Sequence, residues 1–271
     1  MMAQIIDRRQ LKADMKQLLR TAQVAPKAMT ALFMFILLVL NLAEAAASIN
    51  MDGSIIDTFV SILATLMSSV LSIGFIQYCM AVRRSERVEF LSLFDGFSFA
   101  GKIIALDLII SAFVMLWSML FVIPGIIASY RYRFAMYNLC ENPNMSVMEA
   151  LDMSKRQTQG YKAQLFMLDF SYVGWSMLAT IPATAFNLYA SYQTAASMFG
   201  FNGPELAMAI SPLMQILLSG LWDLLISLFY LAVYRCTELG YFEIAKSTSG
   251  VGAGYRSRSW SDEGPDGLGG L

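Results

Sequence analysis

Long apolar runs alternate with short polar segments along this chain of 271 residues. Several of the runs exceed about 18 residues, the length that a helix needs to cross the hydrocarbon core of a bilayer. The pattern predicts an all-α fold, that of a polytopic membrane protein with about six spanning helices paired into three hairpins. The membrane domain is expected over residues 28–246. The expected spans are 28–47, 55–82, 102–123, 125–139, 164–190 and 207–233.

A shorter amphipathic stretch precedes each of the three hairpins. Apolar side chains recur at helical spacing, and polar side chains fill the remainder, in residues 8–20, 88–99 and 147–159. We expect short interfacial helices that lie along the membrane surface. For the third stretch, an ordinary solvated loop helix is the alternative. The three units do not align residue by residue, so the recurrence is a pattern of organisation and not a duplication.

The N-terminal segment, residues 1–27, is basic as well as amphipathic. Asp7 can cap a helix that carries Leu11, Met15 and Leu19 on one side. Lysines and arginines lie around the rest of that helix, which suits a surface helix facing anionic headgroups. A cleaved signal peptide is the alternative, but this basic segment is long and further spans follow it.

The third amphipathic stretch has clear ends. Ser146 and Glu149 have the spacing of a capping box, in which the hydroxyl and the carboxylate satisfy free amides of the first turn. Gly160 is the expected stop, because glycine readily adopts the left-handed conformation that ends many helices.

Prolines mark the expected helix breaks. Pro124 lacks an amide hydrogen and Gly125 tolerates turn dihedrals, so we expect this pair to end a helix between the third and fourth spans. Pro182 is expected to kink the fifth span, and Pro212 lies near the outer end of the sixth.

Composition excludes an ordinary soluble domain and gives no indication of catalysis. Only 14% of the residues are charged, against about 25% in soluble domains. The absence of histidine removes the commonest general base and metal ligand. Cys79, Cys140 and Cys236 lie too far apart for a zinc site. We therefore expect no cofactor, no metal, no nucleic-acid partner and no enzymatic activity.

The basic residues lie on one side of the predicted topology. The chain has nineteen Lys and Arg residues, and none of them lies in the two predicted outer loops. The positive-inside rule then places both termini in the cytoplasm, and the protein in the cytoplasmic membrane. A five-span topology that fuses residues 102–139 into one helix would move seven of the nineteen outside, so we favour six spans. The Gly- and Ser-rich tail, residues 247–271, is expected to be disordered.

Five charged residues fall inside the predicted spans. By helical rise, Asp107, Arg131, Arg133 and Asp169 lie about 8 to 12 Å from the inner membrane edge, and Asp223 lies about 15 Å from it. An arginine at the bilayer centre costs about 2.5 to 3.5 kcal/mol on insertion scales. We therefore hypothesise that the first two aspartates named, Asp107 and Asp169, pair with the two arginines. Snorkelling of both arginines is the alternative. Asp223 is expected to be protonated or to bond to a serine row on the second span.

Two long stretches resemble a known family. They are IPGIIASYRYRFAMY and ENPNMSVMEALDMSKRQTQGYKAQLFMLDFSYVGW, accompanied by DRRQLKADMKQLL near the start. They are similar to an uncharacterised bacterial family of integral membrane proteins, domain of unknown function 975. The resemblance covers most of residues 7–245 and implies a polytopic membrane protein without a known activity. More weakly, Glu141, ALDMSK and Gly160 resemble the membrane domain beside some glycerophosphodiester phosphodiesterases. The catalytic domain of those enzymes is not found here, so no hydrolase function is implied.

Two functions fit these observations. The first is a structural, interaction or lipid-responsive membrane protein, with anionic headgroups and an unidentified membrane protein as partners. The alternative is a transporter or lipid-handling permease that uses the intramembrane Asp/Arg layer. A polar cavity reaching Asp107, Asp169 and Asp223 would favour transport, and a dry, packed interior would favour the structural role.

Overall fold

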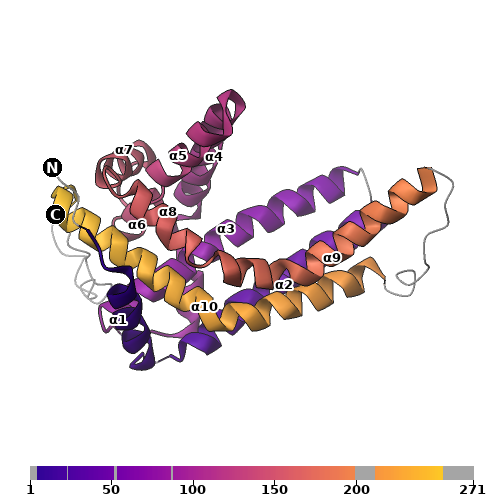
Figure 1. Cartoon of the computed structure of the whole chain (residues 1–271), viewed down its shortest axis with the longest axis horizontal. Helices are drawn as coiled ribbons and strands as arrows, with labels where there is room; N and C mark the ends of the chain where they lie inside the picture. Colours follow the sequence, from indigo (N-terminus) through magenta and orange to yellow (C-terminus); the bar gives the residue numbers. More distant parts are fainter. Residues whose placement is uncertain (1–4, 23, 52–53, 87, 199–210, 253–271) are drawn as a thin grey trace, which may run out of the picture. The chain divides into compact units, whose positions relative to one another are not determined.

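The computed structural model describes residues 5–22, 24–51, 54–86, 88–198 and 211–252. Every regular element in these residues is a helix (Figure 1). In chain order they are α1 (Arg8–Arg20), α2 (Pro26–Met51), α3 (Ile55–Arg83), the 3₁₀ helix η1 (Phe90–Phe99), α4 (Ala100–Leu120), α5 (Val122–Arg131), α6 (Ala135–Glu141), α7 (Val147–Gln157), α8 (Lys162–Phe170), α9 (Val173–Met198) and α10 (Pro212–Ser249).

Four helical segments in the described residues are long and apolar enough to cross a membrane. They are Pro26–Ile49, Ile55–Arg83, Phe90–Leu120 and Pro212–Ser249. The third combines η1 with α4. The predicted fourth span, 125–139, is divided between α5 and α6, and the predicted fifth, 164–190, is divided between α8 and α9. The all-α prediction therefore holds for the described residues, and the six-span arrangement stays a prediction.

The chain divides into two compact units. Among the described residues, the first unit contains Gly101–Lys162 and residues 241–252. The second contains Ile6–Ala100 and Ala163–Gly240. Three of the described helices contribute residues to both units, since α4 begins at Ala100, α8 begins at Lys162 and α10 passes Gly240.

In the first unit, aromatic side chains of α6 and α10 form the centre of the core. The Phe242 ring centroid lies 5.5 Å from that of Phe134 and 5.4 Å from that of Tyr137, and all three side chains are fully buried. Ring pairs at these distances add attraction beyond the burial of their surface. They fix the short helix α6 against the last turns of α10.

In the second unit, four long helices and η1 pack closely. Phe33 on α2 packs against Phe75 of α3 with 5.0 Å between ring centroids and the rings tilted by 30°. Between α9 and α10, the Trp222 indole N–H donates to the Leu178 carbonyl at 2.9 Å. A Cβ at Gly74 of α3 would lie 1.8 Å from a backbone oxygen of η1, so the close packing of η1 on α3 requires glycine there.

The helix α1 begins as the sequence predicts. The Asp7 carboxylate accepts from the Arg9 amide at 2.9 Å, which confirms the cap. Leu11, Met15 and Leu19 are buried. They pack on protein: the Met15 sulfur accepts from Arg83 of α3 at 3.1 Å. The apolar side of α1 is therefore covered by the helix bundle, while basic side chains such as Lys16 and Arg20 are exposed.

The first helix break does not lie at the predicted proline. The chain is extended at Phe121, and α5 starts at the next residue, so that Pro124 falls in its first turn. Proline fits there because amides of the first turn need no intrahelical partner. Gly125 is also helical, and a Cβ there would lie 2.0 Å from the Ser118 hydroxyl of α4. The glycine therefore permits close helix packing, in place of the expected turn.

Neither Pro212 nor Pro182 ends a helix. Pro212 begins α10, the position at which proline is favoured, and the Ser211 hydroxyl accepts from the Met214 amide at 3.3 Å. The predicted start of this span at residue 207 lies outside the described residues. Pro182 lies inside α9, which continues through it, and its kink stays a prediction.

The C-terminal boundary differs as well. The tail was expected from Ser247, yet α10 continues to Ser249. Residues 253–271, the larger part of the predicted tail, lie outside the described residues.

Candidate functional site

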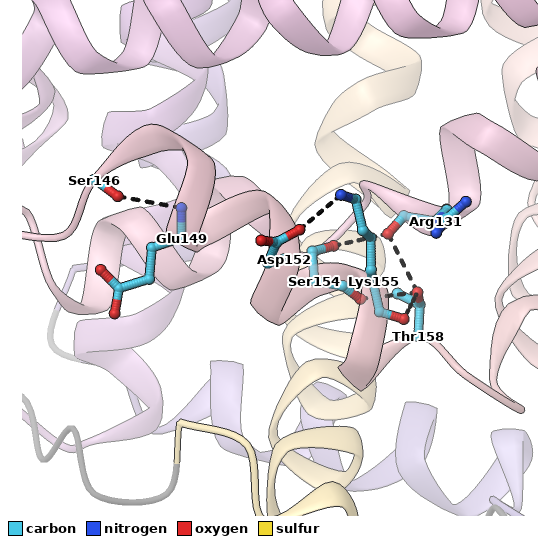
Figure 2. A network of polar contacts seen from close by, with 7 residues as sticks. All are labelled: Arg131, Ser146, Glu149, Asp152, Ser154, Lys155 and Thr158. Carbon is cyan, nitrogen blue, oxygen red and sulfur yellow. Dashed lines mark hydrogen bonds and ion pairs between the residues drawn. The ribbon is translucent and has the colours of Figure 1, made fainter.

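The break between α5 and α6 is closed by two hydroxyl groups of α7. Where a helix ends, backbone amides and carbonyls lose their intrahelical partners. The Ser154 hydroxyl donates to the Arg131 carbonyl at 3.0 Å and accepts from the Phe134 amide at 3.1 Å. The Thr158 hydroxyl donates to the same carbonyl at 3.2 Å. Figure 2 shows both hydroxyls directed at the Arg131 carbonyl.

The predicted ends of α7 are confirmed. The Ser146 hydroxyl accepts from the Glu149 amide at 3.2 Å, and Gly160 has a left-handed φ of 83° just after the helix. On its exposed side, Lys155 donates to Asp152 at 2.7 Å (Figure 2). This hydrogen bond lowers the pKa of the Asp152 carboxyl.

Two polar pairs lie beside this break, the first buried and the second partly buried. The side-chain amides of Asn138 and Gln157 exchange hydrogen bonds of 2.8 and 2.9 Å, and Gln157 also donates to the Val251 carbonyl at 3.2 Å. Glu141 at the end of α6 forms an ion pair with Lys246 of α10. Buried polar groups matched in this way stabilise one arrangement of the core, because each would be costly without its partner.

Both predicted arginines flank the break rather than lie inside a continuous helix. Arg131 ends α5 with an exposed side chain, and its carbonyl is the acceptor described above. Arg133 is half-buried within the break, its guanidinium 5.7 Å from the centre of the Tyr130 ring. Asp107 is half-buried on α4 in the same unit. The Asp/Arg layer stays a prediction.

Asp169 lies in the second unit, on α8, where a tyrosine is one of its partners. The Tyr234 hydroxyl of α10 donates to the Asp169 carboxylate at 2.8 Å. Sequence reasoning did not identify Tyr234. Its place next to Val233, at the predicted inner membrane edge, is typical of a tyrosine that turns its hydroxyl toward a polar group.

A second break, between α8 and α9, is closed by cations of α1. Arg8 donates to the Met167 carbonyl at 2.7 Å, and Lys12 donates to the Ser171 hydroxyl at 2.6 Å. The Lys12 ammonium also lies 4.0 Å above the Tyr172 ring. Positive charge is favourable at the carbonyl end of a helix, here that of α8. This second break was not predicted.

An acidic cavity of about 670 Å³ lies in the second unit among α2, α3, α9 and α10. Its lining includes the carboxylates of Glu44, Asp57 and Asp223, and among the described lining residues there is no Lys or Arg. Asp223 accepts from the Ser227 hydroxyl on its own helix at 3.2 Å, rather than from the serine row of α3. We call this space the acidic cavity.

A polar cavity that reaches Asp107, Asp169 and Asp223 would favour transport, and the acidic cavity meets this condition only in part. It reaches Asp223, but Asp107 and Asp169 are not among its described lining residues. Within the described part of the chain, no three metal-binding side chains converge. Sequence reasoning gave no role to Asp57, because its neighbours in the cavity come from helices far along the chain.

The chain was compared with known proteins. No curated protein and no solved structure shows a significant match. The weaker likeness to the glycerophosphodiester phosphodiesterase membrane domain stays a prediction. Residues 119–247, which include the α5–α6 break and α7, match the family described as "Protein of unknown function (DUF975)". The expected resemblance is confirmed over these residues, and for residues 7–118 it stays a prediction.

Proposed function

We propose that this chain is a multi-pass protein of the cytoplasmic membrane with a structural or interaction role, and that it responds to anionic lipid through its basic surface helices. Four apolar helices support the membrane part. The structural role is supported by the polar contacts of the first unit. There, hydroxyls, amides and an ion pair hold the divided helix α5–α6 in place. Polar groups matched to each other in this way stabilise a fold and leave little reactivity for chemistry.

The proposed topology has six crossings with both termini in the cytoplasm. In it, α5 and α6 together make the fourth crossing, and α8 and α9 make the fifth. Divided helices are tolerated at membrane depth where protein groups satisfy the backbone, as the α7 hydroxyls do at the first break. The excess of Lys and Arg on one side of this topology supports the orientation.

Cysteine labelling tests the topology. In a chain whose three native cysteines are replaced by serine, Lys155→Cys should react with a membrane-impermeant maleimide only after cells are permeabilised. Thr194→Cys, exposed near the end of α9, should react in intact cells. Labelling of the first variant from outside would contradict the topology.

The lipid response rests on α1. Because Leu11, Met15 and Leu19 pack on the bundle, the helix presents its basic sides outward. Lys16 and Arg20 are exposed there. Each basic residue near an anionic surface contributes about 1 kcal/mol of attraction.

Thermal unfolding of the full chain in nanodiscs tests this response. We expect a higher Tm in phosphatidylglycerol than in phosphatidylcholine at low salt. The difference should shrink near 1 M salt, where the Debye length is only about 3 Å. The double variant Lys16→Gln with Arg20→Gln should reduce the difference. Equal stability of the wild-type chain in both lipids at low salt would contradict the lipid response.

A permease is the second candidate, and the acidic cavity favours it. Three carboxylates from three helices line a space with no described basic residue, which suits a cationic solute or a proton pathway. In proteoliposomes, uptake of the cation ethidium and proton flux reported by entrapped pyranine would be compared between wild type and Asp223→Asn. The exposed residue Asp14 on α1 provides the control Asp14→Asn. Flux that is absent in wild type, or equal in all three chains, would remove this candidate.

A further inference from the structure

A small basic hollow lies where the start of α1 meets the break between α8 and α9. It has a volume of about 370 Å³ and is lined by Ile6, Asp7, Arg8, Arg9, Lys12 and Ser171. This volume lies near the lower end of the range of about 300 to 1,000 Å³ for small-molecule sites. We refer to this space as the basic hollow.

The cations of the basic hollow occupy positions that are electrostatically unfavourable in a helix. Arg8 and Arg9 occupy the first turn of α1, where the positive end of the helix dipole disfavours cations, and the first turn has no acidic residue. Arg8 and Lys12 lie one turn apart on the same side, where like charges repel. Burial, and then the charge of Arg8, lower the pKa of Lys12. A bound anion would offset each of these costs.

The lining has one carboxylate, that of Asp7, and it does not neutralise the three positive charges of the basic hollow. Asp7 is committed to the helix cap, since its Oδ1 atom accepts from the amides of Arg9 and Gln10 at 2.9 and 3.4 Å. The lining therefore keeps three cations against one carboxylate.

Hydrogen-bond donors remain for a ligand. The bond from Arg8 to the Met167 carbonyl uses one of five guanidinium N–H groups, and the bond from Lys12 to Ser171 uses one of three ammonium N–H groups. Arginine forks combined with lysine and hydroxyl groups suit the oxygens of a phosphate.

We infer that the basic hollow binds a phosphate-bearing anion, supplied by the headgroup of an anionic phospholipid. This inference rests on the proposed lipid response and names its specific site. The location supports it: α1 contacts Arg83 at the end of α3, the end that the distribution of basic residues assigns to the cytoplasmic surface. Headgroup phosphates lie at that level of a bilayer.

Native mass spectrometry of the detergent-solubilised full chain, titrated with dioleoylphosphatidylglycerol, tests the site. Arg9→Gln and Lys12→Gln each remove one cation from the hollow. Their matched controls are Lys16→Gln and Arg20→Gln, which remove the same charge from α1 outside the hollow. We expect about tenfold weaker binding for each hollow variant, the loss of one charge-assisted bond, and less than about twofold weakening for each control.

The choice of variants distinguishes a loss of lipid binding from a loss of folding. Arg9 has an exposed side chain, so Arg9→Gln is expected to keep the lipid-free Tm of the wild type even if Lys12→Gln does not. Equal weakening by hollow variants and controls would overturn the specific site while leaving the general lipid response in place. Absence of any phosphatidylglycerol binding by the wild type would overturn both.

Two further probes define the ligand chemistry. Cholesteryl hemisuccinate carries a carboxylate and no phosphate, and equally tight binding of this amphiphile at the same residues would overturn phosphate recognition. Inorganic phosphate distinguishes the source. If millimolar phosphate raises the Tm in neutral detergent, and Arg9→Gln abolishes the rise, the hollow takes soluble phosphate and the lipid assignment is overturned. We expect no such rise.

Discussion

The two helix breaks use opposite chemistry. In the first unit, the α5–α6 break is closed by Ser154 and Thr158, neutral hydroxyls that are fully buried. In the second unit, the α8–α9 break is closed by Arg8 and Lys12, cations that are only half-buried. Short neutral bonds in a dry core are insensitive to salt, whereas partly exposed charges respond to salt and to nearby anions. We therefore expect the stability of the first break to be independent of salt, and that of the second to depend on salt and on nearby anions.

The largest effect should come from removing both hydroxyls at the first break. Ser154→Ala combined with Thr158→Val removes these partners from the buried Phe134 amide and from the partly buried Arg131 carbonyl. Each such group costs about 1 to 3 kcal/mol, so we expect a loss of about 3 kcal/mol in the free energy of unfolding. Unfolding in mixed micelles of mild detergent and SDS measures it. The exposed hydroxyl of Ser247 provides the control Ser247→Ala, and a loss of equal size there would contradict the assignment.

One glycine from each unit sharpens the comparison next. A Cβ at Gly125 would meet the Ser118 side chain at 2.0 Å, whereas a Cβ at Gly174, near the second break, meets nothing within 4 Å. Gly125→Ala should destabilise the protein by about 2 kcal/mol through overpacking. Gly174→Ala should be neutral or stabilising by up to about 1 kcal/mol, as expected from helix propensity. The same unfolding assay compares them, and similar values for both variants would show that the first unit is no more tightly packed at Gly125 than the second unit is at Gly174.

A smaller effect is expected at the second break. Arg8→Gln removes the bond to the Met167 carbonyl and should cost about 1 kcal/mol at low salt, because the guanidinium is only half-buried. Near 1 M salt, where the Debye length is about 3 Å, most of this loss should disappear. Unfolding at the two salt concentrations measures the change. If the loss were independent of salt, the distinction between the two breaks would fail.

The smallest effect belongs to the exposed pair on α7. The pKa of Asp152 is lowered in the folded state by Lys155, so its contribution to stability is present above the ordinary carboxyl pKa of about 3.9 and is lost as the pH falls through the folded pKa. Because the pair is solvent-exposed, Asp152→Asn should leave the Tm at pH 7 unchanged within error. A clear drop in Tm would mean that the exposed side of α7 is covered by a partner.

Local features of the fold could be read from the sequence, and distant contacts could not. Asp7, Ser146 and Gly160 act on their own helix ends, so spacing alone located them. The break predicted at Pro124 lies instead at Phe121, between α4 and α5, because proline is tolerated in a first turn. The second break has no proline, and its bonds join residues 159 positions apart. No local pattern could predict it.

The candidate sites show the same limit. Depth by helical rise grouped Asp107 with Asp169, yet these residues belong to different compact units. Conversely, Glu44, Asp57 and Asp223 line one cavity although they come from three separate helices. Helical rise gives only the depth of a residue along its span. What the side chain faces also depends on the rotation of the helix about its axis, which tertiary packing determines.

The buried apolar side of α1 has a consequence for biogenesis. Leu11 of this helix packs against Gly240, which is added to the growing chain more than two hundred residues later. At about 5 to 20 residues per second, the interval is roughly ten to fifty seconds. During that interval part of the apolar side of α1 lacks its partner on α10, although α3, which contacts Met15, is made much earlier. We therefore expect the packing of α1 to be completed only late in synthesis.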